Sequence, residues 1–469
     1  MTGWETMTTV AWSSAGAGRS GTGPAWSAPW IAAAVALVVL GAGAAACFTS
    51  PILGVAALAL PAAPLLVLAP HLAVLGLVAA LPFDALSSLD DTGALSLTRL
   101  LGVAVVGGWV LYVVASPRRR VRLGRPGALL FAYVLFATIS IGWASDTDVT
   151  GAALCTLAQL FLLYVMAANV LDDWSRIARA LDVLLLATTV LAVMVLAEAA
   201  SGAGRAVLRY GQYEVNPNFL AAQLAVPAVT ALAFRARQIP LGWWRMLAVV
   251  PIVLALVATG SRGGAVAFAA GLATLAIGRP RLATRGLAAL ALVALLLPAV
   301  LSDNTLQLLR HRWEKTENDR LAGRLDIWRV GLAMVADRPL QGTGFAGFHD
   351  AFYQYMLETP VDPRFALMHS RGNRVAHNIY LSTVAELGLV GGTLFGLALA
   401  AHTRTAWRIR RAAMQVGDDE AEDVALALLA GVITLLVAGA CTELLLCKTP
   451  WLFLAAVQGA AIAAGWERA

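Results

Sequence analysis

The residues best suited to chemistry are a few arginines and one histidine that interrupt long apolar stretches. Arg262 follows Ser261 and precedes two glycines, between two apolar runs, and Arg324 opens a helical pattern inside a polar segment. His377 precedes Asn378 where that segment returns to an apolar run. Guanidinium groups bind phosphate oxygens in bidentate fashion, and histidine accepts a proton near neutral pH. The pattern favours a phosphate-bearing substrate, with His377 as general base.

Other polar residues near helix ends are weaker candidates for the same site. An arginine before the Asn-Pro-Asn helix start could join the diphosphate-binding set, and the rest are candidate substrate-binding groups. They are Arg209 in the first role and Tyr213, Asn218, Arg374, Asn378 and Lys448 in the second. Structural alternatives stay open: snorkelling for the arginines, anchoring for Lys448, and loop structure for Tyr213 and Asn218. For His377 the alternative is a capping or interfacial role.

Several arginines that converge on one cavity suit a diphosphate, because they neutralise it without a metal ion. The chain has no nucleotide-binding glycine motif and no paired-carboxylate metal motif, so we expect neither a metal nor another cofactor. Nucleotides are not normally offered outside the cell. A lipid-linked sugar diphosphate is therefore the predicted class of substrate for an outward-facing site.

The composition predicts an all-α polytopic membrane protein. Hydrophobic residues make up 59% of the chain and charged residues 13%, against about 25% charged residues in an ordinary soluble domain. Apolar runs recur at the length that a helix needs to cross a bilayer. The net charge of +6 gives no reason to expect nucleic acid, because most of the arginine surplus lies in short loops between apolar segments.

We expect 12–14 transmembrane helices from these runs. The predicted spans are 30–48, 51–69, 71–85, 99–116, 127–143, 151–171, 178–200, 217–235, 243–258, 262–278, 283–301, 376–401, 423–445 and 449–466.

Arginine-rich short loops, such as 118–125 and 404–411, predict the cytoplasmic side and place both termini there. The chain then divides into four parts. These are a flexible cytoplasmic tail (1–28), an N-terminal transmembrane bundle (29–301), an extracytoplasmic catalytic loop on the periplasmic side (302–376), and C-terminal transmembrane helices with a short cytoplasmic tail (377–469). The acidic stretch 412–422 is interpreted as a solvated cytoplasmic loop.

The extracytoplasmic loop has internal order. From Gly323 to Asp337, apolar residues fall at helical spacing, which predicts an amphipathic helix suited to a membrane surface. Pro339 ends this helix, and Gly342 and Gly344 allow a tight turn before a cluster of phenylalanines.

Taken in order, these pieces resemble the O-antigen ligase and O-antigen polymerase family of bacterial envelope enzymes. The resemblance covers about residues 205–466 and rests on short motifs. They are Asn216-Pro217-Asn218, Ser261-Arg262-Gly263, Gly323-Arg324 with Trp328, Pro339-Leu340-x-Gly342-x-Gly344-Phe345, and His377-Asn378-x-Tyr380-Leu381 with Glu386-x-Gly388.

The resemblance implies a GT-C-like, metal-independent, inverting glycosyltransferase at the outer face of the inner membrane. It would take a glycan from undecaprenyl diphosphate and pass it to an acceptor hydroxyl borne by a lipid or a glycan. Carried over by motif, Arg262 and Arg324 would hold the diphosphate, and His377 would act as base or orient the acceptor. A ligase acting on a lipid A-core or similar terminal acceptor is favoured slightly; a polymerase that joins lipid-linked repeat units, or a flippase for such glycans, are the alternatives.

Overall fold

The computed structural model describes residues 66–86, 96–115, 120–200, 209–210, 213–235, 243–314, 323–368 and 374–466. The described chain is almost entirely helical, as predicted, with one short two-stranded hairpin in addition. The elements are α3 (Pro70–Ala80), η1 (Leu81–Leu86), α4 (Leu97–Val114), α5 (Gly124–Ile139), η2 (Ser140–Trp143), α6 (Thr147–Val170), α7 (Trp174–Ala200), β1 (Arg209–Tyr210), β2 (Tyr213–Glu214), α8 (Pro217–Ala233), α9 (Trp243–Ala258), α10 (Arg262–Gly278), α11 (Pro280–Val300), α12 (Asp303–Glu314), α13 (Arg324–Asp337), α14 (Phe348–Glu358), α15 (Pro363–Met368), α16 (Ile379–Val416), α17 (Asp419–Gly439) and α18 (Lys448–Ala463).

Seven of the described helices are long and apolar enough to cross a membrane. They are α4, α5 with η2, α6, α7, α11, α16 and α17. Shorter apolar helices are α3, which precedes α4, and α8, α9 and α10, which lie between α7 and α11 along the chain. The all-α polytopic fold is thereby confirmed. The predicted tail 1–28, the span 30–48 and nearly all of 51–69 lie outside the described residues.

Helix α8 lies at the centre of the bundle and is buried along almost its whole length. Helices α9, α10 and α17 pack around it. Small residues bring these helices close together: a Cβ added to Gly271 of α10 would overlap Val229 of α8 and Thr434 of α17. Close backbone approach is how helices associate in a bilayer, where lipid chains are as apolar as leucine.

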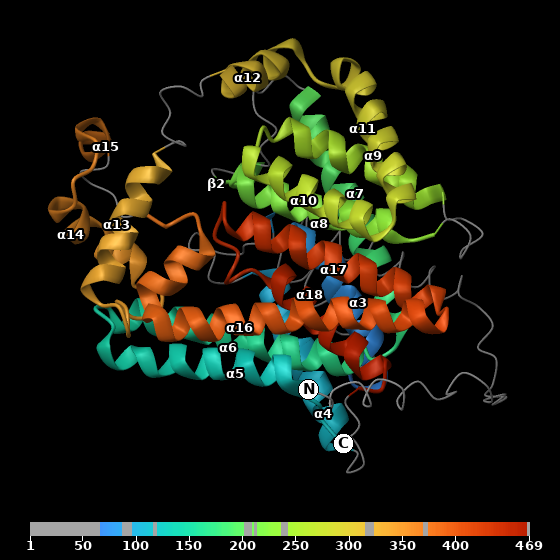
Figure 1. Cartoon of the computed structure of the whole chain (residues 1–469), viewed down its shortest axis with the longest axis horizontal. Helices are drawn as coiled ribbons and strands as arrows, with labels where there is room; N and C mark the ends of the chain where they lie inside the picture. Colours follow the sequence, from blue (N-terminus) through green and yellow to red (C-terminus); the bar gives the residue numbers. More distant parts are fainter. Residues whose placement is uncertain are drawn as a thin grey trace, which may run out of the picture.

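The polar segment between α11 and α16 folds into helices with a small core of their own. In Figure 1, α13, α14 and α15 lie together at the left end of the bundle, where α16 begins. Val330 and Met334 of α13 pack with Phe348 and Phe352 of α14 in this core. The amphipathic helix predicted from Gly323 to Asp337 is present as α13. Two leucines of its predicted apolar stripe, at positions 325 and 332, are exposed rather than buried.

The Pro339–Phe345 motif fastens this helical segment to α16. The backbone N–H groups of Thr343 and Gly344 donate to the carbonyls of Ala385 and Glu386, at 3.0 and 2.8 Å. Gly342 has φ 68°, and a Cβ there would overlap the backbone of Glu386. Glycine is therefore required by both conformation and space. The motif positions the first turns of α16.

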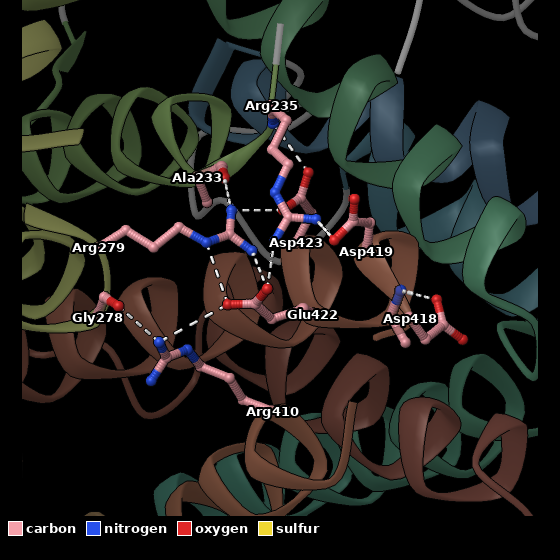
Figure 2. A network of polar contacts seen from close by, with 10 residues as sticks. Ala233, Arg235, Gly278, Arg279, Arg410, Asp418, Asp419, Glu422 and Asp423 are labelled. Atoms are coloured by element: carbon pink, nitrogen blue, oxygen red, sulfur yellow. Dashed lines mark hydrogen bonds and ion pairs between the residues drawn. The ribbon is translucent and has the colours of Figure 1, made fainter. Parts of the chain in front are cut away.

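Charged residues gather at the far end of α16 and the start of α17, as Figure 2 shows. Arg279 donates to Glu422 Oε1 at 3.1 Å and pairs with Asp423, and Arg235 pairs with the same two carboxylates. Asp423 is fully buried. The interpretation of 412–422 as a solvated loop is wrong, because α16 continues to Val416 and α17 begins at Asp419. Acidic residues in the first turn of α17 complement the helix dipole and bind arginines of three neighbouring segments.

Candidate active site

The starts of α8 and α10 lie side by side at one end of the bundle. The Ser261 side chain caps α10 by accepting from the Gly264 N–H at 3.0 Å. Its hydroxyl also donates to Asn218 Oδ1 at 2.7 Å, in the first turn of α8. Arg262 is the first residue of α10. The structure therefore brings two predicted site residues, Asn218 and Arg262, to the same helix ends.

The segment between α17 and α18 lies against the start of α10. A Cβ built on Gly263 would lie 2.6 Å from Cys441 Cβ, so the two backbones approach closely at this point. The glycine that follows Arg262 is thus explained by packing. The close approach also places the α17–α18 segment between the start of α10 and the start of α16.

Glu443, in the α17–α18 segment, fixes the start of α16. Its carboxylate accepts from the Asn378 backbone N–H at 3.2 Å and from the Ser382 hydroxyl at 3.1 Å. Asn378 caps α16 by accepting from the backbone N–H groups of Tyr380 and Leu381 at 3.0 and 3.2 Å. Burial raises the pKa of Glu443 above its ordinary value, while hydrogen bonds from Asn378, Ser382 and the His377 backbone act in the opposite direction. Glu443 was not among the residues predicted from the sequence.

His377 lies directly before this helix start in a left-handed backbone conformation, with φ 51°. Such a conformation is uncommon for a residue other than glycine and is concentrated at functional sites. Burial lowers the pKa of His377, and the positive charges of Arg324 and Arg374 lower it further. His377 is therefore neutral at pH 7, the form in which imidazole accepts a proton.

Trp328 holds α13 against the histidine. Its indole N–H donates to the carbonyl of Ala376 at 3.0 Å. Arg324 is one helical turn before Trp328, so both side chains lie on the same face of α13. The predicted residues Arg324, Arg374 and His377 are thereby brought together. Arg324 and Arg374 belong to the polar segment between α11 and α16, whereas His377 lies directly before α16 at the edge of the bundle.

Helix dipoles add to the positive charge of this end of the molecule. Helices α8, α10, α13 and α16 all begin here, and Arg262 and Arg324 are the first residues of their helices. The N-terminal end of a helix carries a partial positive charge and exposes backbone N–H groups, so anions bind there. Arginines combined with helix starts form an environment suited to a phosphate-bearing ligand.

The remaining predicted residues have other environments. The ammonium of Lys448 lies 2.7 Å from both carboxylate oxygens of Asp84 and 3.1 Å from the Thr98 hydroxyl. It ties α18 to η1 and α4, in agreement with the anchoring alternative. Arg209 and Tyr213 lie on the hairpin β1–β2, directly before α8, and their side chains are outside the described part of the chain.

Glu386 plays a structural part. Its buried carboxylate accepts from the backbone N–H groups of Ala346 and Phe348 at 3.0 and 3.4 Å. It thus completes the attachment of the Pro339–Phe345 motif to α16. Within the described ranges, no group of three or more His, Cys, Asp or Glu residues is placed to hold a metal ion.

The fold and this site define a class: a polytopic α-helical membrane protein with arginines and a histidine at neighbouring helix starts. Residues 247–396 match the family model described as O-antigen ligase. This match confirms the resemblance to that family over a stretch that includes Arg262, Arg324, Arg374, His377 and Asn378. No curated protein matches the chain.

Proposed function

We propose that the protein is a metal-independent, inverting glycosyltransferase that takes a glycan from undecaprenyl diphosphate. The observation that carries this proposal is the convergence of Arg324, Arg374 and His377, with Arg262 at an adjoining helix start. The match to the O-antigen ligase family supports the same class of reaction. Arg209 stays a predicted member of the diphosphate-binding set.

In the proposed step, an acceptor hydroxyl oxygen attacks the anomeric carbon from the side opposite the diphosphate. The new glycosidic bond forms as the bond from carbon to the diphosphate oxygen breaks, which inverts the anomeric centre. The imidazole of His377 takes the hydroxyl proton, and Arg262 and Arg324 stabilise the negative charge that develops on the leaving diphosphate. Preorganised cations of this kind are usually the largest catalytic contribution in such a transfer.

We propose that the site faces the periplasm and that the charge cluster of Arg235, Arg279 and Arg410 faces the cytoplasm. The two lie at opposite ends of α10 and α17. Helix α17 contains 21 residues, about 31 Å at 1.5 Å per residue, which matches the apolar thickness of a bilayer. Arginines in short loops at the second end agree with the positive-inside rule.

For the acceptor, we propose a lipid A-core or a similar terminal lipid- or glycan-borne hydroxyl. The support is the family description and the long helical segment that lies beside His377. A polymerase would use the same chemistry on a second lipid-linked repeat unit.

The test is reconstitution of the purified protein in liposomes with an undecaprenyl diphosphate-linked glycan and a core acceptor. We expect the glycan to move to the acceptor, with EDTA leaving the rate unchanged. His377→Ala and Arg262→Ala should abolish transfer. The matched controls are His349→Ala, whose side chain is 52% exposed beside Asp350, and Arg281→Ala, which is exposed at the far end of the bundle.

Each outcome of this test has a definite meaning. Glycan that lengthens on the carrier would replace the ligase by a polymerase. Movement of the donor across the bilayer without any new glycosidic bond would replace the enzyme by a flippase. Full transfer by both His377→Ala and Arg262→Ala would remove the site assignment.

A further inference from the structure

A polar cavity lies between helix ends that the candidate active site does not use. Its volume is about 280 Å³. The starts of α3 and α7 and the ends of α4, α6 and α18 surround it. Its charged lining consists of Arg120, Arg122, Arg176 and Asp172, with His71 at its edge. Three arginines against one aspartate give a formal charge of +2 (three minus one), so the cavity favours an anion.

Hydrogen bonds fix the backbone of Arg122, whereas its guanidinium group has no hydrogen-bond partner among the described residues. The Arg122 N–H donates to Asn169 Oδ1 at 2.8 Å, and Asn169 Nδ2 donates to the Arg122 carbonyl at 2.9 Å. Within the described ranges, the side chains of Arg120 and Arg122 form no hydrogen bond or ion pair. Arg176 differs, because it binds Asp172 at 2.6 Å and the Val170 carbonyl at 3.3 Å. The backbone of Arg122 is thus fixed, and the guanidinium groups of Arg120 and Arg122 have no acceptor among the described residues.

The cavity and the candidate active site lie at opposite ends of the bundle. Helix α6 carries Thr150 in its first turn, where the hydroxyl donates to the Phe345 carbonyl beside the Glu386 attachment, and it ends at Val170 in the cavity lining. It contains 24 residues, so its two ends are about 36 Å apart. A ligand in this cavity therefore cannot be the substrate held by His377.

The surroundings of the cavity are those of a membrane interface. Trp109 and Tyr112 line it on α4, and these two residue types concentrate where a bilayer meets water. On the same helix Leu111 and Val114 are 60% and 73% exposed, so the lipid-facing surface of α4 reaches the cavity. Basic pockets between helices at such a level suit the phosphate of an anionic lipid headgroup.

We propose that this cavity binds a phosphate group through Arg120, Arg122 and Arg176, and that the group belongs to an anionic phospholipid of the adjacent leaflet. The starts of α3 and α7 add partial positive charge to the same space. The apolar edge formed by Val113 and Ile462 is suited to the acyl-chain side of such a lipid. The proposal is independent of the reaction at His377.

The test uses the full-length protein in detergent with the double variant Arg120→Gln/Arg122→Gln. The matched control is Arg125→Gln/Arg281→Gln, which removes the same charge from exposed arginines outside the cavity lining. Native mass spectrometry measures binding of phosphatidylglycerol and phosphatidylcholine, and thermal unfolding is followed with each lipid and with inorganic phosphate. Arg176 is left unchanged because its pair with Asp172 supports the start of α7.

We expect phosphatidylglycerol to bind the wild type and the control at least about tenfold more tightly than the double variant. Phosphatidylcholine should distinguish none of the three proteins. Inorganic phosphate could raise the unfolding temperature of the wild type as much as phosphatidylglycerol does. If the double variant loses this effect, the phosphate site is supported and a free anion is identified as its source. Equal phosphatidylglycerol binding by wild type and double variant, or an equal loss in the control, would overturn the proposal.

Discussion

The sharpest prediction concerns Glu443, which touches the start of α16 but not the proposed reacting atoms. Its carboxylate receives the Asn378 N–H and the Ser382 hydroxyl, directly beside the left-handed His377. We expect Glu443→Gln to slow glycan transfer because the imidazole loses its fixed position. Glu443 is therefore predicted to be a positioning residue.

The size of the effect follows from these contacts. A typical hydrogen bond contributes about 0.5–1.5 kcal/mol, and glutamine has one acceptor oxygen where the Glu443 carboxyl group accepts from Asn378 with one oxygen and from Ser382 with the other. The left-handed conformation of His377 costs about 1–3 kcal/mol and persists only while its surroundings hold it. Loss of one such hydrogen bond is comparable with the lower part of that cost. A displacement of about 1 Å at a reacting group reduces a rate by about a hundredfold, so we expect a ten- to hundredfold fall in kcat.

The assay is the reconstituted transfer reaction, with kcat and KM for the donor measured separately. Positioning of the base should reduce kcat and leave the donor KM close to the wild-type value. Ser382→Ala should give a smaller loss, and the double variant should lose less than the sum of the two single losses, because both residues act through one contact. The matched control is Glu420→Gln, an exposed glutamate in α17 at the opposite end of the bundle.

Wild-type kcat in Glu443→Gln would refute the reasoning. A purely structural role is recognised differently: the thermal unfolding temperature would fall and kcat per folded protein would stay unchanged.

Other substitutions test the remaining parts of the site. Arg262→Lys should lower kcat/KM by roughly tenfold or more in the transfer assay, because an ammonium lacks the bidentate fork; an unimpaired lysine variant would argue against phosphate binding there. Activity should rise with pH through the lowered pKa of His377 and level off by pH 7, since only the neutral imidazole accepts a proton. Arg374→Gln removes a positive charge, so the pKa of His377 and the rise of activity with pH should both move upward, toward pH 6.5. An unchanged pH–activity profile would contradict the effect of Arg374 on the pKa of His377. Gly342→Ala should destabilise the protein by more than about 2 kcal/mol, because it combines positive φ with overlap against the α16 backbone. The control is Gly396→Ala. Gly396 lies in α16, where an added Cβ meets no neighbouring atom, so the unfolding temperature should stay unchanged or rise.

The membrane helices were predictable because the ends of a long apolar run can be located in the sequence itself. The span predicted at 262–278 coincides with α10, and the span predicted at 217–235 differs from α8 only at its end. The sequence also carries a capping signal that the predicted spans did not use: the side chains of Ser261 and Asn378 accept backbone hydrogen bonds at the starts of α10 and α16. These features depend on local sequence, which is why they could be found without a structure.

Contacts between distant segments were not predictable in the same way. Glu443 follows no recognisable motif, and its partner Asn378 is 65 residues away. The acidic stretch 412–422 was wrongly predicted to be solvated because the sequence shows its carboxylates but not the arginines that bind them. A local signal was present: Asp418 caps α17 by accepting from the Ala421 N–H at 3.0 Å, and acidic residues fill the first turn. Only the structure supplies the arginines that make Glu422 and Asp423 buried rather than solvated.

The direction of the helices links the two charged ends of the bundle. At the far end, where α8 and α10 finish, arginines complete the exposed carbonyls: Arg279 donates to Ala233 at 3.2 Å and Arg410 to Gly278 at 2.7 Å (Figure 2). Cations at helix C-termini and anions at helix N-termini are both favourable. At the far end, arginines of the protein itself thus compensate the partial negative charge of the helix ends. At the near end, where α8, α10 and α16 begin, Arg262 and Arg324 add positive charge to helix starts that already favour anions, an arrangement that suits the diphosphate proposed above.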